Sequence, residues 1–164
     1  MLQRIQTVYL LVTFILTVLL LILPMGYMLQ DGMLETFKLN GVGAYRLVTD
    51  EAGAVVASQF EQGAWALFIL ICLIMGVTVY DILSFKKRIF QIRVAIFNMI
   101  LHMGVYALFA LYYFFLMPNQ HVIEGVFQPS YTILFPLFNV VLTYLAIRAI
   151  GADEALVRSL DRLR

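Results

Sequence analysis

Four long apolar runs constrain the fold more strongly than any other feature of this sequence. A helix needs about 20 apolar residues to cross about 30 Å of hydrocarbon. The runs that satisfy this length cover residues 7–28, 63–83, 94–116 and 131–150. The 164-residue chain is 63% hydrophobic and 13% charged, with a mean hydropathy of +0.93, which is outside the range of soluble domains. The sequence therefore predicts an all-α membrane protein, a bundle of four transmembrane helices.

Lysine and arginine are distributed unevenly around these runs. If both termini lie in the cytoplasm, the basic residues on the cytoplasmic side are Arg4, Lys86, Lys87, Arg88, Arg93, Arg148, Arg158, Arg162 and Arg164. Only Lys38 and Arg46 then fall outside. Because cytoplasmic loops carry the excess of basic residues, we expect an N-in, C-in orientation. The end of the first run has no small-x-small cleavage pattern, so we interpret that run as an uncleaved anchor.

Residues 29–62 form the one sizeable polar loop, and they carry a strand pattern. The segments "ETFKL", "AYRLV" and "AVVAS" are rich in β-branched and aromatic residues, and "NGVG" and "TDEAG" separate them. We expect a small extracytoplasmic β-sheet, to which "HVIEGVF" in the second outer loop adds an edge strand. Since small isolated sheets are marginal in water, this sheet should rest on the helix ends or on a partner.

The last residues, 151–164, predict a separate cytoplasmic amphipathic helix that starts after Gly151. Its apolar face consists of Leu156, Leu160 and Leu163, and its basic residues are Arg158, Arg162 and Arg164. These are the candidate contacts to membrane lipid or to a partner. One interpretation is a helix in the headgroup layer, with its arginines at anionic lipid. The other is a docking helix for a cytoplasmic partner.

The two ends of the chain also carry a resemblance. "MLQRIQTVYLL" and "RAIGADEALVRSLDRLR" resemble the opening and closing segments of a Bacteroidota four-helix inner-membrane family, domain of unknown function 4293. The resemblance covers essentially the whole chain and implies four spans in the bacterial inner (cytoplasmic) membrane. No activity is established for that family, so it implies no catalytic residues.

The segment "IFNMILHMGVY" places Asn98, His102 and Tyr106 at intervals of four inside the third run, on one helix face. The rise of about 1.5 Å per helical residue gives the depth of each residue below the end of its span. By this measure Asn139 and Thr13 lie at the depth of His102, and Thr143 lies at the depth of Asn98. Polar groups at equal depth can pair with one another, as hydrocarbon requires. We therefore expect an intramembrane polar network of these six residues. In it His102 is neutral at pH 7, and Asn139 is its first partner.

Three functional interpretations compete with this structural one. A haem inside the bundle usually takes two axial histidines, but His121 is in an outer loop. Proton or ion transport requires acids within the membrane, whereas Asp81 is at the end of its span and within reach of the basic cluster 86–88. The residues that could line a quinone-type or lipid groove are Tyr106, Tyr112, Tyr113 and His102, although aromatic residues at a span end more often form an interfacial belt.

Composition excludes several other classes. The net charge of +1 argues against a nucleic-acid partner. A single cysteine, Cys72, excludes an internal disulfide, a zinc knuckle and an iron–sulfur cluster within one chain. We predict no cofactor, no metal site and no catalytic residues.

The favoured function is a non-catalytic accessory or scaffolding subunit of an inner-membrane assembly, with membrane lipid and other inner-membrane subunits as partners. Two alternatives stay open. They are a small redox or quinone-interacting membrane protein, and a carrier of lipid or small solutes.

Overall fold

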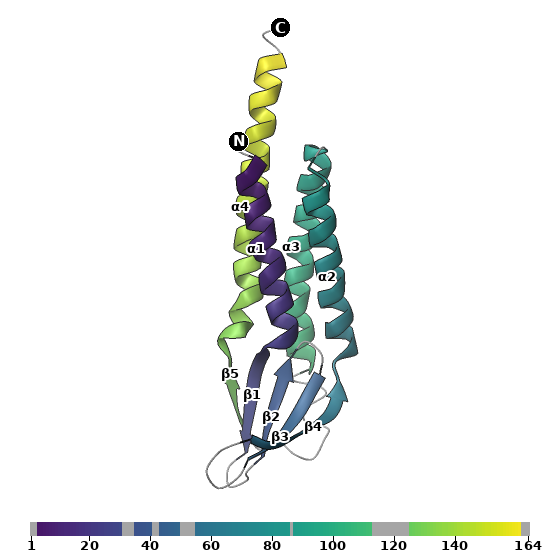
Figure 1. Cartoon of the computed structure of the whole chain (residues 1–164), viewed down its shortest axis with the longest axis vertical. Helices are drawn as coiled ribbons and strands as arrows, with labels where there is room; N and C mark the ends of the chain where they lie inside the picture. Colours follow the sequence, from purple (N-terminus) through teal and green to yellow (C-terminus); the bar gives the residue numbers. More distant parts are fainter. Residues whose placement is uncertain are drawn as a thin grey trace.

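The computed structural model describes residues 3–30, 35–40, 43–49, 55–85, 87–112 and 125–161. In this part of the chain, long helices run side by side and a β-sheet closes one end of them (Figure 1). We call the opposite end of the bundle, where α1 begins and α2 ends, the far end.

Four helices in the described part of the chain are long and apolar enough to cross a membrane. They are α1 (Gln3–Ile22), α2 (Trp65–Leu83), α3 (Arg88–Leu111) and α4 (Phe135–Asp161), the last preceded by the 3₁₀ turn η3 (Tyr131–Leu134). The helices form a ring in which α1 and α3 each pack against both α2 and α4. Each long apolar run of the sequence thus contributes one helix.

The helix bounds differ from the expected spans at the sheet end of α1. The span was expected to reach residue 28, but α1 ends at Ile22 and a strand starts at Pro24. Proline has no N–H to donate to a helix and is tolerated at the start of a strand, so it ends the helix here. At the far end α3 starts at Arg88, before the expected residue 94. The expected end of that span, residue 116, lies outside the described residues.

The sheet has five antiparallel strands in the order β4-β3-β2-β1-β5. Their bounds are β1 (Pro24–Gln30), β2 (Glu35–Asn40), β3 (Gly43–Thr49), β4 (Val55–Gly63) and β5 (Gly125–Pro129). The three expected segments of the first loop correspond to β2, β3 and β4, and β5 occupies an edge. The sequence analysis missed β1, which pairs with both β2 and β5 and therefore joins the two loops into one sheet.

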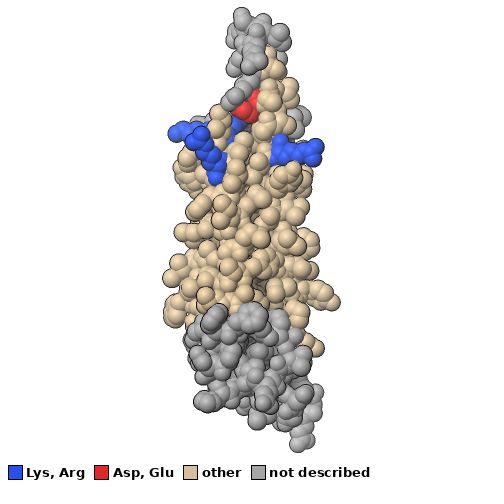
Figure 2. Space-filling model, turned by 180° about the vertical axis from the view of Figure 1, so that it is seen from behind, with Lys and Arg blue, Asp and Glu red and all other residues tan. Residues whose placement is uncertain are grey.

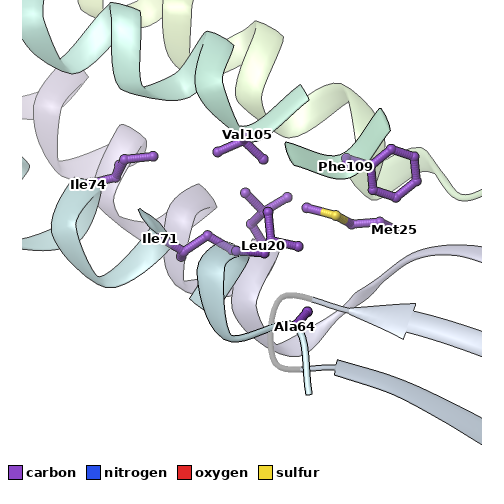
Figure 3. Packing of buried hydrophobic residues seen from close by; sticks show 8 residues of the cluster. Leu20, Met25, Ala64, Ile71, Ile74, Val105 and Phe109 are labelled. Carbon is purple, nitrogen blue, oxygen red and sulfur yellow. The ribbon is translucent and has the colours of Figure 1, made fainter. Parts of the chain in front are cut away.

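An apolar cluster lies between the bundle and the sheet (Figure 3). Leu20 of α1, Ile71 of α2 and Val105 of α3 meet Met25 of β1 there, and each is at most 1% exposed. Because Met25 belongs to the sheet and packs among the helices, this cluster fixes the sheet to the bundle end.

Helix α4 continues through Gly151 without a break, so the separate C-terminal helix expected from the sequence is absent. Glycine costs a helix interior only about 1 kcal/mol, and good helix formers follow it. Arg88 also holds this region by ion pairs with Asp153 (3.2 Å) and Glu154 (3.8 Å). Residues 151–161, which we call the arm, carry α4 past the ends of the other helices (Figure 1).

Candidate functional site: a polar core in the helix bundle

Buried polar side chains line the inward faces of all four helices. We call this set the polar core. It comprises Gln6, Thr13 and Thr17 on α1, Thr78 and Asp81 on α2, Gln91, Asn98 and His102 on α3, and Asn139 and Thr143 on α4. Their spacing of three, four or seven residues along each helix keeps them on one face. Each helix therefore presents a polar stripe to the inside and apolar side chains to the outside.

The hydroxyl of Thr17 is the junction at the centre of the bundle. Asn139 donates its Nδ2–H to Thr17 Oγ1 at 3.1 Å, and His102 Nε2 lies 3.5 Å from the same oxygen. Thr17 itself donates to the backbone oxygen of Thr13 at 2.8 Å. One side chain of α1 thus connects α3 and α4.

The ring of His102 is oriented by its own helix. Its Nδ1 lies 2.8 Å from the backbone oxygen of Asn98. A carbonyl only accepts, so Nδ1 carries the hydrogen, and in the neutral ring Nε2 is left as the acceptor that faces Thr17. Nδ1 is therefore satisfied by its own helix. Nε2 lies against Thr17 Oγ1 but receives no hydrogen from it, because the single hydrogen of that hydroxyl goes to Thr13.

The expected pairings of the network differ from those observed. His102 and Asn139 are linked through Thr17 instead of directly. Asn98 donates to Thr78 Oγ1 at 2.9 Å, whereas we expected Thr143 at its level. Matching depth identifies residues at one level of the membrane, but the direction of each side chain around its helix axis decides which of them meet.

Two threonines of the expected network bond only within their own helices. Thr143 donates to the backbone oxygen of Asn139 at 2.7 Å, and Thr13 to that of Tyr9 at 3.0 Å. This back-bonding satisfies a hydroxyl inside the membrane without a second helix. Both are buried members of the polar core, but these bonds add no side-chain link between helices.

Tyr106 lies apart from this network. It is half-buried, and its hydroxyl donates to the backbone oxygen of Ile133 at 2.7 Å and accepts from the N–H of Leu137 at 3.1 Å. It thereby ties α3 to the start of α4, where backbone groups have no helical partner. Of the three polar residues of "IFNMILHMGVY", two enter the core and the third fixes a helix start.

At the far end the polar core contains Gln6, Asp81 and Gln91. Gln91 Nε2 donates to the backbone oxygen of Asp81 at 3.1 Å. Gln6 Nε2 and both carboxylate oxygens of Asp81 have no hydrogen-bond partner among the described residues. Asp81 was expected within reach of the basic cluster 86–88. Residue 86 lies outside the described residues, Lys87 is exposed, and Arg88 pairs with the arm instead.

Two cavities open beside these residues. One, of about 500 Å³, is lined by Gln6, Thr7, Val8, Leu11, Ile82, Leu83, Phe85 and Gln91. The other, of about 700 Å³, lies between the start of α3 and the arm, and it is lined by Phe85, Lys87, Arg88, Ile89, Phe90, Arg93, Glu154 and Val157. Figure 2 shows the described Lys and Arg side chains around this end of the bundle, with described acidic atoms at the base of the arm.

The candidate contact residues at the C-terminus are only partly described. Leu156 lies on the arm and is 53% exposed. Arg158 and Leu160 are within α4, but their side chains are not among those described. The predictions for Arg162, Leu163 and Arg164 lie outside the described residues.

The chemistry available in the polar core is hydrogen bonding. Within the described ranges no group of three or more His, Cys, Asp or Glu residues is placed to hold a metal ion. Two tyrosines of the expected groove are separated, since Tyr106 bonds the start of α4 whereas Tyr112 packs against the apolar cluster. Tyr113 lies outside the described residues.

A model of one protein family matches residues 2–163, nearly the whole chain. The chain belongs to that family, described as Domain of unknown function (DUF4293). The DUF4293 match includes the sheet, the polar core and the arm, so these are parts of one family domain and not separate additions. No curated protein matches the chain.

Proposed function

We propose that this DUF4293 protein is a non-catalytic accessory subunit of a bacterial inner-membrane assembly, and that it docks a cytoplasmic partner through the arm. The observation that carries this proposal is the unbroken course of α4 through Gly151 to Asp161.

Membrane insertion is supported by the outward faces of the helices. Large apolar side chains such as Val8, Ile69, Ile100 and Val141 are each at least half exposed, and a soluble protein rarely exposes so large an apolar surface. Lipid chains of a bilayer would cover these apolar faces. The described basic residues at the far end and the sheet at the other end support the N-in, C-in orientation.

The direction of the arm favours docking over lying in the headgroup layer. An interfacial helix lies in the plane of the membrane, so the chain would have to bend where α4 leaves the bilayer. Instead, residues 151–161 extend the same helix by about 16 Å at about 1.5 Å per residue. The ion pairs of Arg88 with Asp153 and Glu154 brace the base of this extension.

The surface beside the arm suggests the chemistry of the partner. The cavity of about 700 Å³ offers the apolar side chains Phe90 and Val157 together with the cations Lys87 and Arg93. Both cations are exposed. A protein segment with acidic residues around an apolar anchor side chain complements this surface.

The test is purification in mild detergent with mass spectrometry of the proteins that remain bound. Val157→Asp places a charge on the cavity wall, and Ser159→Asp places the same charge about 200° around the same helix. We expect the wild type and Ser159→Asp to retain the same stoichiometric partner, and Val157→Asp to lose it.

Two outcomes would overturn the proposal. One is a wild-type sample that carries no stoichiometric protein partner, and the other is equal binding by both variants. A haem or quinone absorption band in the purified protein would favour the redox alternative in place of the accessory role.

A further inference from the structure

Asp81 is the least explained side chain of the polar core. It is 0% exposed, and neither carboxylate oxygen has a hydrogen-bond partner among the described residues. An ionised carboxylate in such a place loses its hydration and gains no ion pair or donor in return. A carboxyl that carries a proton avoids this cost.

The described polar-core groups at this end of the neighbouring helices are uncharged. On α1 they include Gln6, whose Nε2 is unpaired. On α3 they are Gln91, which donates to the backbone of Asp81, and Asn98, which bonds Thr78 one turn away. The residues that α4 buries near the far end are Ala146 and Ile150.

The described charges at the far end are engaged or exposed. Arg88 pairs with Asp153 and Glu154. Lys87, Arg93 and Arg148 are exposed. The nearest titratable group on the polar core is His102, about one helical turn beyond Asn98. None of these forms a recorded ion pair with Asp81 in the described part of the chain.

We propose that Asp81 is a proton-binding site, whose carboxyl holds one proton and exchanges it with the aqueous phase at the far end of the bundle. The route we assign is the cavity of about 500 Å³, whose wall includes Gln91, which donates to the backbone oxygen of Asp81, and Ile82, the next residue along α2. Inside the core, the unpaired Oδ1 of Asn98 offers an acceptor about one turn deeper.

The opposite side of the polar core is closed. The apolar cluster around Leu20, Met25, Ile71 and Val105 lies where the helices meet the sheet (Figure 3). Val105 follows His102 along α3 toward that end. Protons are poorly transferred through such packing because it holds no hydrogen-bonding groups. The site therefore exchanges with one side only. This inference does not depend on the docking role of the arm, nor on which side of the membrane the far end faces.

Infrared spectroscopy of the purified protein at pH 7 tests the proton directly. Exposed and paired carboxylates are ionised at this pH, so a protonated carboxylic acid gives a separate carbonyl-stretching band. We expect this band in the wild type and in Asp153→Asn, which removes an ion-paired acid, and its complete loss in Asp81→Asn. If Asp81→Asn does not fold, aspartate labelled with ¹³C at the carboxyl should shift the band in the wild type, and labelled glutamate should not.

The exchange route is tested by the deuterium shift of the same band after transfer into D₂O. Val8→Trp fills the cavity, and Val12→Trp adds the same bulk one turn along α1 at a position outside the cavity wall. We expect Val8→Trp to slow the shift several-fold and Val12→Trp to leave it unchanged. The absence of a protonated aspartate band at pH 7 would overturn the site, and equal exchange in both variants would overturn the route.

Discussion

Replacing Thr17 with Val tests whether one hydroxyl joins the helices at the centre of the polar core. Valine keeps the branched shape but removes the oxygen. Asn139 Nδ2 then loses its acceptor at 3.1 Å, and His102 Nε2 loses the hydroxyl at 3.5 Å. The helix–helix link is lost while the packing volume is nearly kept.

Thr13→Val is the matched control for this change. Thr13 is on the same helix, is equally buried at 0% exposed, and bonds only the backbone oxygen of Tyr9. Both substitutions remove a back-bond to the same helix, and only Thr17→Val also removes the bond from Asn139. Hydrogen bonds between membrane helices average about 0.6 kcal/mol and reach about 1.7, and an unpaired buried donor adds to the loss. We therefore expect Thr17→Val to lower the free energy of unfolding by about 1–2 kcal/mol more than Thr13→Val.

The assay is reversible unfolding in mixed micelles, followed by far-UV circular dichroism. A double-mutant cycle of Thr17→Val with Asn139→Leu should give a coupling energy of about 1 kcal/mol, because the two residues share one bond. Equal losses for Thr17→Val and Thr13→Val, together with additive effects in the cycle, would show that the hydroxyl does not join the helices.

Three further predictions concern other parts of the molecule. His102→Leu should cost on the order of 1 kcal/mol of stability and leave partner binding intact; a fully stable variant that has lost a bound chromophore in its absorption spectrum would instead indicate a ligand role. The orientation is tested by single cysteines in a Cys72→Ser background. Cysteines placed at Ser84 and Ser159 should react with an impermeant maleimide only in permeabilised cells, whereas a cysteine at Ser58 should react in intact cells. The reverse labelling pattern would show the opposite orientation. Leu47→Pro should disrupt the sheet, because β3 is paired on both sides and proline has no N–H. Leu47→Thr, which keeps the N–H, should not disrupt it. Equal circular dichroism spectra and equal protease resistance of the two variants would argue against this pairing.

The sequence determines the helices well because each needs only length and apolar composition. It also places the strands β2, β3 and β4, whose β-branched residues stand between clear turn signals. Strand β1 escapes prediction because "PMGYMLQ" follows an apolar run and differs little from it in hydropathy. Only Pro24 indicates the change from helix to strand, and a proline also occurs within membrane helices.

The sequence predicts the membrane depth of the polar-core residues but not the hydrogen bonds between them. Asn98, His102 and Asn139 stand out because amides and imidazoles are rare in apolar runs. Thr17 and Thr78 do not stand out in the sequence, because threonine is common in membrane helices and its hydroxyl usually donates to a backbone oxygen of the same helix. Their role depends on the rotation of each helix in the ring, and tertiary packing decides that rotation. The position of Asp81 near the end of its span was predicted, but its burial was not, because only the packed structure shows that it faces inward while Arg88 pairs with the arm.

The pairing of β5 with β1 has a consequence for the order in which the protein is made. Between these two strands the chain contains β2, β3, β4, α2 and α3, so most of the sheet emerges from the ribosome well before β5 does. Until then β1 has an open edge whose backbone groups can pair with another chain. The loop before α4 closes that edge. A nascent chain that stalls before β5 should therefore expose the edge of β1, whereas β5 covers that edge in the finished protein.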